Sequence, residues 1–212
     1  MLDFFLISPI LLLLSVTDVV MHLYLDSKKA RRDRSALFRE PVVRVGRGPM
    51  AAVAVSTLLA FLLVLLMSVA PLFSLTALLV GATGPLLDAP FILWLPGFVL
   101  LCLGIVLHGW SRWVRQAMAS SWEMRSDQVL ITAGPYSWVR HPSYTSYMLS
   151  FAGLFMMVPS LVAALLLIGI PGYYEVALTE EKHLVSHFGQ SYQAYMLKTG
   201  RFFPRLGVRS KP

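Results

Sequence analysis

The sequence predicts an all-α integral membrane protein, a bundle of about five transmembrane helices with a small C-terminal cap on the cytoplasmic side. Three observations lead to this fold class. Of the 212 residues, 57% are hydrophobic and 14% are charged, whereas a soluble domain carries about 25% charged residues. The mean hydropathy is +0.67, and apolar runs are long enough to cross a bilayer. The net charge of +7 comes from Lys and Arg in the loops beside these runs.

The first predicted span covers residues 2–25. No basic residue precedes its apolar run and no small-residue cleavage site follows, so we expect a retained span and not a cleaved signal. Asp18 is the unusual residue here. An acidic side chain at membrane depth is costly and usually faces a bundle interior or a cavity. The alternative is a position near the interface, because Asp26 and Lys28 follow soon after.

The next segments set the topology. Residues 26–48 hold eight Lys or Arg against three acids, so the positive-inside rule places this loop in the cytoplasm. A second span covers 50–69, and residues 72–90, with no Lys or Arg, read as an outer connection. A third span covers 91–110, and the basic stretch 111–127 should return to the cytoplasm. The N-terminus is therefore expected outside.

The last apolar region, residues 144–176, predicts a helix–turn–helix hairpin. Pro159 divides it into two arms that each reach about 22–26 Å, compared with a hydrocarbon core of about 30 Å. Both ends of the hairpin, and the basic C-terminal tail, should lie on the cytoplasmic side.

A polar motif, GPYSWVRHPSY at 134–144, precedes this hairpin. Gly134-Pro135 is typical of a turn. Pro142 disfavours a helical conformation at His141 and suits the first turn of the next helix. Free N–H groups at that helix start favour a nearby anion, and Arg140 can pair with a carboxylate. The alternative is an interfacial belt of polar and aromatic side chains that meet lipid headgroups.

A second polar motif begins at Glu180-Glu181. We expect a helix to start here, because acids suit the positive end of the helix dipole. His183 and His187 are four residues apart and can approach one zinc ion, but there is no third ligand at a recognisable spacing. We therefore predict no metal site. Since Cys102 is the only cysteine, a cysteine-based metal cluster is also excluded.

Together the two motifs suit a zwitterionic nucleoside cofactor. Ammonium and hydroxyl groups need carboxylates, a carboxylate needs Arg, His or helix N–H groups, and an adenine needs an aromatic or apolar slot. Residues 128–144 and 180–181 offer all three. This chemistry matches S-adenosylmethionine without specifying it.

At these residues the chain resembles the isoprenylcysteine carboxyl methyltransferase family of membrane proteins, and more loosely the membrane phospholipid methyltransferases. The likeness covers residues 121–204, through the Tyr-x4-His-Pro-x-Tyr pattern, the Glu pair and FG-xx-Tyr-xx-Tyr. It implies one methyltransferase domain over residues 1–212, in which 1–110 supply spans and 111–212 bind S-adenosylmethionine, with S-adenosylhomocysteine as product. The cofactor contacts implied are Gln128, Leu130, Ile131, Tyr136, His141, Pro142, Tyr144, Glu180 and Glu181.

The resemblance also implies a lipophilic acceptor that enters from the lipid bilayer. Family members acting on prenylcysteine carry an Arg four residues before the Glu pair, where this chain has Val176. Arg201 can substitute for it, and the nearest polar groups are Glu175, Tyr173 and Tyr174. For an amine or hydroxyl acceptor, the candidate bases are Glu175, His141 and Tyr174. A carboxylate of the isoprenylcysteine type and a phospholipid-type amine or thiol both remain open as acceptors.

Two further classes remain as alternatives, a non-enzymatic membrane scaffold or transport protein and a relative of the sterol reductases. The short chain without eukaryotic targeting resembles a prokaryotic member. We therefore expect the plasma (inner) membrane, with the C-terminus and active site in the cytoplasm. The sequence predicts no nucleic-acid partner, because no recognised module is present, and it leaves the oligomeric state open.

Overall fold

The computed structural model describes residues 4–32, 45–75, 84, 91–115 and 129–205. All regular elements in these ranges are helices. In chain order they are α1 (Phe4–Arg32), α2 (Arg47–Val69), the 3₁₀ turn η2 (Ala70–Phe73), α4 (Phe91–Arg115), the 3₁₀ turn η3 (Gly134–Ser137), α5 (Pro142–Met157), α6 (Leu161–Leu166), α7 (Gly169–Phe188) and α8 (Gln190–Lys198). The all-helical class that the sequence predicts is confirmed for the described residues.

Four segments of the described chain are long and apolar enough to cross a membrane. They are Ile7–Lys28, Arg47–Phe73, Ile92–Arg115 and Leu161–Phe188. Large apolar side chains face outward on them, among them Leu13, Leu58 and Ile92, which are 59–77% exposed. A soluble protein rarely exposes so much apolar surface, whereas a bilayer requires it. The chain is therefore an integral membrane protein.

The expected hairpin is present, but its returning arm contains a second break that the sequence analysis does not predict. The chain does turn after α5, where the Ser160 side chain caps α6 by accepting a hydrogen bond from the Ala163 N–H at 3.1 Å. The returning arm then breaks again at 167–168, because Pro171 has no N–H to donate to the preceding turn. The break joins α6 to α7, which together form the long Leu161–Phe188 segment. The outgoing arm α5 has 16 residues and reaches about 24 Å.

The prediction that a helix begins at Glu180 is wrong. Helix α7 begins at Gly169 and continues through the Glu pair to Phe188. Gly189 follows as the C-cap residue of the helix, with a φ of +55° that suits glycine. No helix-breaking residue lies between Val176 and Glu180, so nothing in the sequence stops the helix there. The two acids therefore lie towards the negative end of a helix dipole, and they need cationic or hydrogen-bonding partners of their own.

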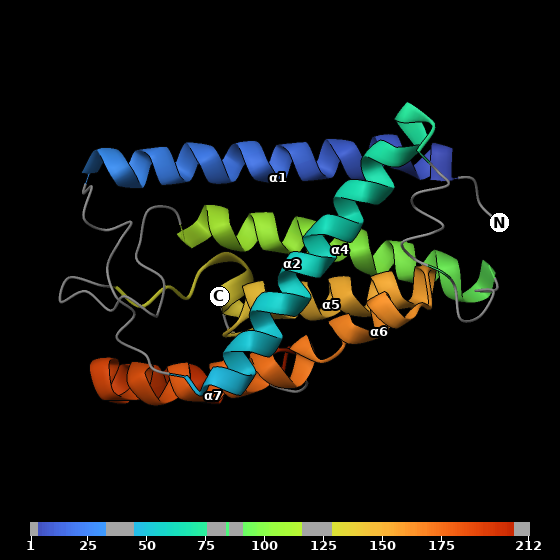
Figure 1. Cartoon of the computed structure of the whole chain (residues 1–212). Helices are drawn as coiled ribbons and strands as arrows, with labels where there is room; N and C mark the ends of the chain where they lie inside the picture. Colours follow the sequence, from blue (N-terminus) through green and yellow to red (C-terminus); the bar gives the residue numbers. More distant parts are fainter. Residues whose placement is uncertain (1–3, 33–44, 76–83, 85–90, 116–128, 206–212) are drawn as a thin grey trace.

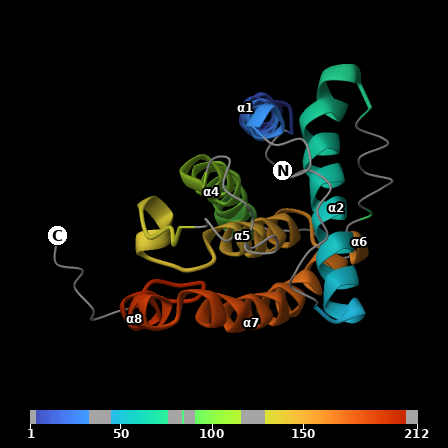
Figure 2. The same ribbon diagram turned by 90° about the vertical axis from the view of Figure 1, so that its left-hand side faces the viewer.

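Glycines allow α4 and α5 to pack closely along their length (Figures 1 and 2). A Cβ added at Gly153 would lie 2.6 Å from the Gly97 carbonyl oxygen and 2.8 Å from the Leu101 nitrogen. Small residues let membrane helices approach to backbone contact. Helix α2 crosses the bundle obliquely and reaches α7 (Figure 1). A Cβ at Gly172 on α7 would lie 3.1 Å from the Pro49 carbonyl. These contacts fix α5 against α4 and the first turn of α7 against α2.

Candidate functional site

The site begins with the turn that the first motif predicts. Gly134 has φ +58° and starts η3, and a Cβ there would also lie 2.8 Å from Val114 on α4. Pro142 occupies the first position of α5, and His141 is its N-cap with φ −122° and ψ 59°. The non-helical conformation expected at His141 is therefore confirmed. It directs the imidazole away from the helix axis and towards α7.

Backbone pairing joins this turn to the C-terminal end of the described chain. The Arg140 N–H donates to the Gly200 carbonyl at 2.9 Å, and the His141 N–H donates to the Arg201 carbonyl at 3.1 Å. The Gly200 N–H donates back to the Trp138 carbonyl at 3.1 Å. Residues 138–141 and 200–201 thus form a short paired segment beside α7, which brings the two sequence motifs into one site.

Glu180 is buried at the centre of this site, with 1% of its surface exposed. The Tyr144 hydroxyl donates to its Oε1 at 2.6 Å. The His141 Nδ1 lies 3.4 Å from its Oε2. Both partners come from the His-Pro-x-Tyr segment, so that segment and the first Glu of the pair form one polar unit.

Glu181 has a different set of partners. The Arg140 Nε donates to its Oε1 at 2.8 Å. Arg201 donates to its Oε2 twice, from Nε at 3.0 Å and from Nη2 at 2.7 Å. Both carboxylate oxygens are therefore occupied by guanidinium groups, in the charge-assisted geometry that makes strong pairs. The expectation that Arg140 can pair with a carboxylate is met by Glu181, which ties α7 to both paired segments.

His141 lies between the two carboxylates. Its Nε2 is 3.3 Å from Glu181 Oε1, in addition to the contact of Nδ1 with Glu180. Burial disfavours the imidazolium, but the neighbouring Glu180 and Glu181 outweigh burial and raise the pKa of His141 above its ordinary value. The ring also stacks on Tyr144, with centroids 5.3 Å apart. When protonated, His141 offsets part of the negative charge on α7.

A cavity of about 100 Å³ opens beside Glu180. Its wall combines charged, aromatic and apolar side chains. The lining residues are Arg115, Val129, Leu130, Ile131, Tyr136, Arg140, His141, Pro142, Ser143, Tyr144, Glu180, Leu184, Phe188, Tyr192 and Tyr195. Of the predicted cofactor contacts, Glu181 lies behind this wall and Gln128 lies outside the described residues. The others all line the cavity.

The sequence reasoning did not assign several of these wall residues. Tyr192 and Tyr195 belong to the FG-xx-Tyr-xx-Tyr pattern, whose spacing places both on one face of α8. Leu184 and Phe188 are four residues apart on α7. Arg115 ends α4, far from either motif in sequence. The Tyr195 hydroxyl donates to the Tyr136 carbonyl at 2.5 Å and so holds α8 against η3.

Two buried polar atoms of wall residues, Arg115 Nε and the Tyr192 hydroxyl, have no hydrogen-bond partner within the described residues. His141 Nε2 makes no hydrogen bond there either, but it keeps its 3.3 Å contact with Glu181. A buried donor or acceptor without a partner costs about 1–3 kcal/mol, and such atoms are uncommon in proteins. Their convergence on one cavity is the pattern expected where a polar ligand supplies the missing partners. A donor set of guanidinium and phenol, beside the buried Glu180 carboxylate, fits a zwitterion such as S-adenosylmethionine.

Three of the residues predicted to act on the acceptor lie outside this cavity. Glu175 is exposed on α7, and Tyr174 is 45% exposed. The Arg201 guanidinium is held by Glu181 and lies over the Tyr174 ring, 5.4 Å from its centroid. Val176, at the position of the family arginine, is fully buried. Arg201 and Tyr174 are thus brought together, beside the cavity and not within it.

Comparison with known proteins supports the resemblance. Residues 93–191 match the family model described as phospholipid methyltransferase. The matched region starts in α4, earlier than the residue 121 that the motifs predict. The protein-S-isoprenylcysteine O-methyltransferase of Schizosaccharomyces pombe is 36% identical over 112 residues, which are 50% of this chain and 47% of that protein. The predicted likeness to this group of membrane methyltransferases is confirmed.

Two bacterial relatives match at similar levels. The nickel-cobalt-cadmium resistance protein NccN of Alcaligenes xylosoxydans xylosoxydans is 35% identical over 85 residues, 40% of each chain. The cobalt-zinc-cadmium resistance protein CzcN of Cupriavidus metallidurans is 38% identical over 86 residues, 40% of this chain and 39% of that protein. The chain therefore spans less than half the length of each curated relative it matches here. The names of the family and of the S. pombe relative indicate a methyltransferase.

Proposed function

We propose that this chain is a membrane-embedded methyltransferase that uses S-adenosylmethionine and methylates a lipophilic acceptor reached from the bilayer. The observation that carries the proposal is the cavity beside Glu180. Its wall contains seven of the nine cofactor contacts implied by the resemblance, and two buried polar atoms of wall residues, on Arg115 and Tyr192, have no hydrogen-bond partner within the described residues.

The residues on the wall divide into three groups by the chemistry that each offers. Glu180, fixed by Tyr144, is suited to accept hydrogen bonds from an ammonium or from ribose hydroxyls. Arg115 and Tyr192 are suited to donate to a carboxylate, each with a polar atom that has no partner in the described chain. Leu130, Ile131 and Phe188 offer an apolar slot for a flat base. S-adenosylmethionine, when bound, supplies an electrophilic methyl group and leaves as S-adenosylhomocysteine.

The protein's own part in the reaction is positioning and exclusion of water. The Arg140–Glu181–Arg201 pairs hold the His-Pro turn against α7, so the wall is organised before a ligand binds. Such preorganisation can supply a large share of a rate enhancement when the reacting groups are aligned. A carboxylate or thiolate acceptor needs no general base, whereas an amine or hydroxyl does.

We propose an isoprenylcysteine-type carboxylate as the first acceptor class. Arg201 is then the candidate grip for that carboxylate, since its Nε and Nη2 bind Glu181 and fix the guanidinium at the edge of α7. A phospholipid-type amine or thiol is the second class, and the apolar Val176 in place of the family arginine favours it. In that case Glu175 or Tyr174 is the candidate base.

For the topology, we propose five spans. Helix α5 and the α6–α7 arm form the hairpin, α8 forms a small cap, and the basic segments face the cytoplasm of a prokaryotic inner membrane. A scaffold or transport protein without enzyme activity is the competing class. Unpartnered polar atoms beside a buried carboxylate favour a small-molecule site over that class.

A methyl-transfer assay tests the proposal. Detergent-purified protein is incubated with methyl-labelled S-adenosylmethionine and either farnesylated cysteine or a phospholipid extract, in parallel with Glu180→Ala. We expect label in the organic phase with wild type and none with the variant. Label released as methanol by mild base identifies an ester and the carboxylate class, and base-stable label identifies the amine or thiol class. Equal labelling by wild type and Glu180→Ala would remove the cavity from the reaction.

A further inference from the structure

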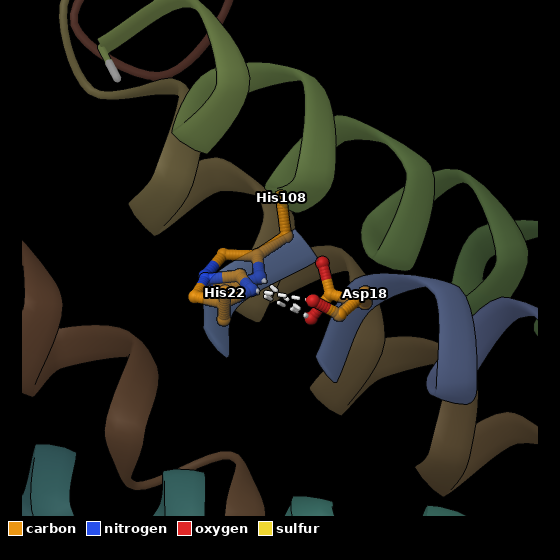
Figure 3. A group of neighbouring side chains, drawn as sticks. All are labelled: Asp18, His22 and His108. Atoms are coloured by element: carbon orange, nitrogen blue, oxygen red, sulfur yellow. Dashed lines mark hydrogen bonds and ion pairs between the residues drawn. The ribbon is translucent and has the colours of Figure 1, made fainter. Parts of the chain in front are cut away.

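A second polar cluster lies between α1 and α4, apart from the cavity beside Glu180 (Figure 3). Asp18 and His22 are one turn apart on α1 and so share a face. His108 comes from α4. In Figure 3 the two imidazole rings lie one over the other and both present a nitrogen to the Asp18 carboxylate. The ring centroids are 4.9 Å apart and the planes differ by 11°.

The spacing of the ligand atoms fits a bound metal ion. His22 Nδ1 lies 3.5 Å from Asp18 Oδ2, and His108 Nδ1 lies 3.4 Å from the same oxygen. One ligand atom from each residue lies within 4.8 Å of the other two. In a tetrahedral zinc site with bonds of about 2.1 Å, neighbouring ligand atoms are about 3.4 Å apart. The observed separations therefore match two edges of such a tetrahedron.

The surroundings also resemble those of a metal ligand set. The Tyr147 hydroxyl lies 2.9 Å from His108 Nε2. A proton on Nε2 leaves Nδ1 bare towards Asp18, and metal-ligating histidines are commonly oriented by such an outer partner. Asp18 Oδ1 is buried without a hydrogen-bond partner within the described residues. The carboxylate thus has unused capacity as a ligand.

The cluster sits within two predicted spans, Ile7–Lys28 and Ile92–Arg115. A carboxylate at membrane depth is costly and calls for a compensating charge, and a divalent cation supplies it. The cluster opens onto a hollow of about 470 Å³ that Arg112 and Asp26 also line. These two side chains pair with each other. The hollow itself leaves room for water or another ligand at an open coordination position of the metal.

We propose that Asp18, His22 and His108 bind one divalent transition-metal ion between α1 and α4. Two imidazoles and a carboxylate suit zinc, cobalt or nickel better than magnesium or calcium, which prefer all-oxygen sites. The site departs from the sequence prediction of no metal, which considered His183, His187 and Cys102 but not these three residues. Binding requires His22 to release the Asp18 carbonyl, which lies 2.8 Å from its Nδ1. The inference does not rest on methyl transfer.

Cobalt titration of the full chain tests this site, with a purification tag that contains no histidine. We expect visible d–d absorption that saturates at one Co²⁺ per chain and is displaced by Zn²⁺. Asp18→Asn, which keeps the size of the side chain, should abolish the signal, and His108→Ala should do the same. The matched control is His183→Ala with His187→Ala on α7, which should bind Co²⁺ as wild type does.

Tyr147→Phe gives a graded readout. Loss of the outer partner of a metal ligand costs about 10–100-fold in affinity, and the phenyl ring preserves the packing. Monodisperse elution and an unchanged unfolding temperature identify folded variants. If His108→Ala does not fold, the Co²⁺ titration of Asp18→Asn alone tests the proposal. The proposal is overturned if wild type binds no Co²⁺, if Asp18→Asn binds normally, or if only the α7 double variant loses the signal.

Discussion

Tyr144 and Tyr147 lie one turn apart on α5 and serve two different polar sites. The Tyr144 hydroxyl donates to Glu180 beside the cavity, whereas the Tyr147 hydroxyl contacts His108 in the α1–α4 cluster. The Glu180 site lies where the His-Pro turn, α7 and α8 meet. The other site lies between two apolar spans and consists of three residues. One short helix therefore supports both, and each site can be perturbed with the other as its control.

The comparison shows two ways to keep charge inside a helical bundle. At the Glu pair, protein cations neutralise Glu181 completely, and the neighbouring Glu180 is left facing a cavity. At Asp18, two imidazoles contact a single carboxylate, whose Oδ1 is buried without a hydrogen-bond partner within the described residues. In the first arrangement the protein supplies the compensating charges itself, and only the atoms that face the cavity are left for a ligand. The second calls for an added positive charge.

The largest predicted effect is on the free energy of unfolding, and it distinguishes the two carboxylates of the Glu pair. Glu181→Ala should lower the free energy of unfolding by about 3–5 kcal/mol, because it leaves Arg140 and Arg201 without their buried partner. Urea unfolding in a mild detergent measures the change. Glu180→Gln, which keeps a hydrogen-bonding group for Tyr144, should cost far less stability yet lose the cofactor. Equal destabilisation by both variants would contradict the division into an anchor and a ligand-binding carboxylate.

The next largest effect is on ligand affinity, and it distinguishes Tyr144 from Tyr147. Tyr144→Phe should weaken S-adenosylhomocysteine binding about 10–100-fold, because a hydrogen bond to a charged group contributes about 1.5–3 kcal/mol and holds Glu180 in place. Calorimetric titration gives the affinity. Tyr147→Phe should leave that affinity unchanged and weaken Co²⁺ binding. A loss of cofactor binding in both variants would mean that the two sites are one.

Disrupting the backbone contact between α4 and α5 should affect both sites together. Gly153→Ala places a Cβ against the Gly97 carbonyl and should cost about 1–3 kcal/mol by overpacking, with the unfolding temperature as the readout. Gly48→Ala is the matched control, since a Cβ there meets nothing within 4 Å. That control should be neutral or slightly stabilising. An unchanged unfolding temperature in Gly153→Ala would show that the helices can separate at little cost.

A smaller effect concerns the two tyrosines of α8. The Tyr192 hydroxyl has no partner within the described residues, so Tyr192→Phe should leave stability unchanged and weaken S-adenosylhomocysteine binding about 10-fold, the low end for one hydrogen bond to a charged group. Tyr195→Phe removes the bond to the Tyr136 carbonyl and should cost about 1 kcal/mol of stability. Destabilisation by Tyr192→Phe would indicate a hydrogen-bond partner outside the described residues.

The smallest effect is a pH dependence of stability. The pKa of His141 is raised in the folded protein from the ordinary 6.5. Its stabilising contribution is therefore complete below about pH 6.5 and is lost as the pH rises through the raised value. The difference in unfolding free energy between wild type and His141→Gln should shrink over that alkaline range. A difference that grows with pH would show that His141 is neutral in the fold.

The sequence predicted the parts of the site that local rules control. Pro142 and Gly134 set backbone conformations within a few residues, so the turn and the N-cap position of His141 follow from them. The burial of Glu180 beside that turn was expected only through the resemblance. The helix start at Glu180 was predicted incorrectly because acids at a helix beginning are a weak signal, and buried partners elsewhere explain them better.

The remainder depends on contacts that sequence spacing cannot show. His108 reaches Asp18 across 90 positions, and the sequence marks Asp18 as unusual without showing which residue it meets. Arg115 joins the cavity only because α4 packs against η3. The anchoring of Glu181 by Arg201 needs the chain to return after α8. Tertiary packing of helices, and not local propensity, decides each of these contacts.

The central claim is that the cavity beside Glu180 binds S-adenosylmethionine, and calorimetric titration with S-adenosylhomocysteine tests it most directly. Wild type should bind one molecule per chain, Glu180→Ala should show no heat of binding, and Glu175→Ala, on the exposed face of the same helix, should bind as wild type does. No binding by folded wild-type protein, or equal binding by wild type and Glu180→Ala, would contradict the account.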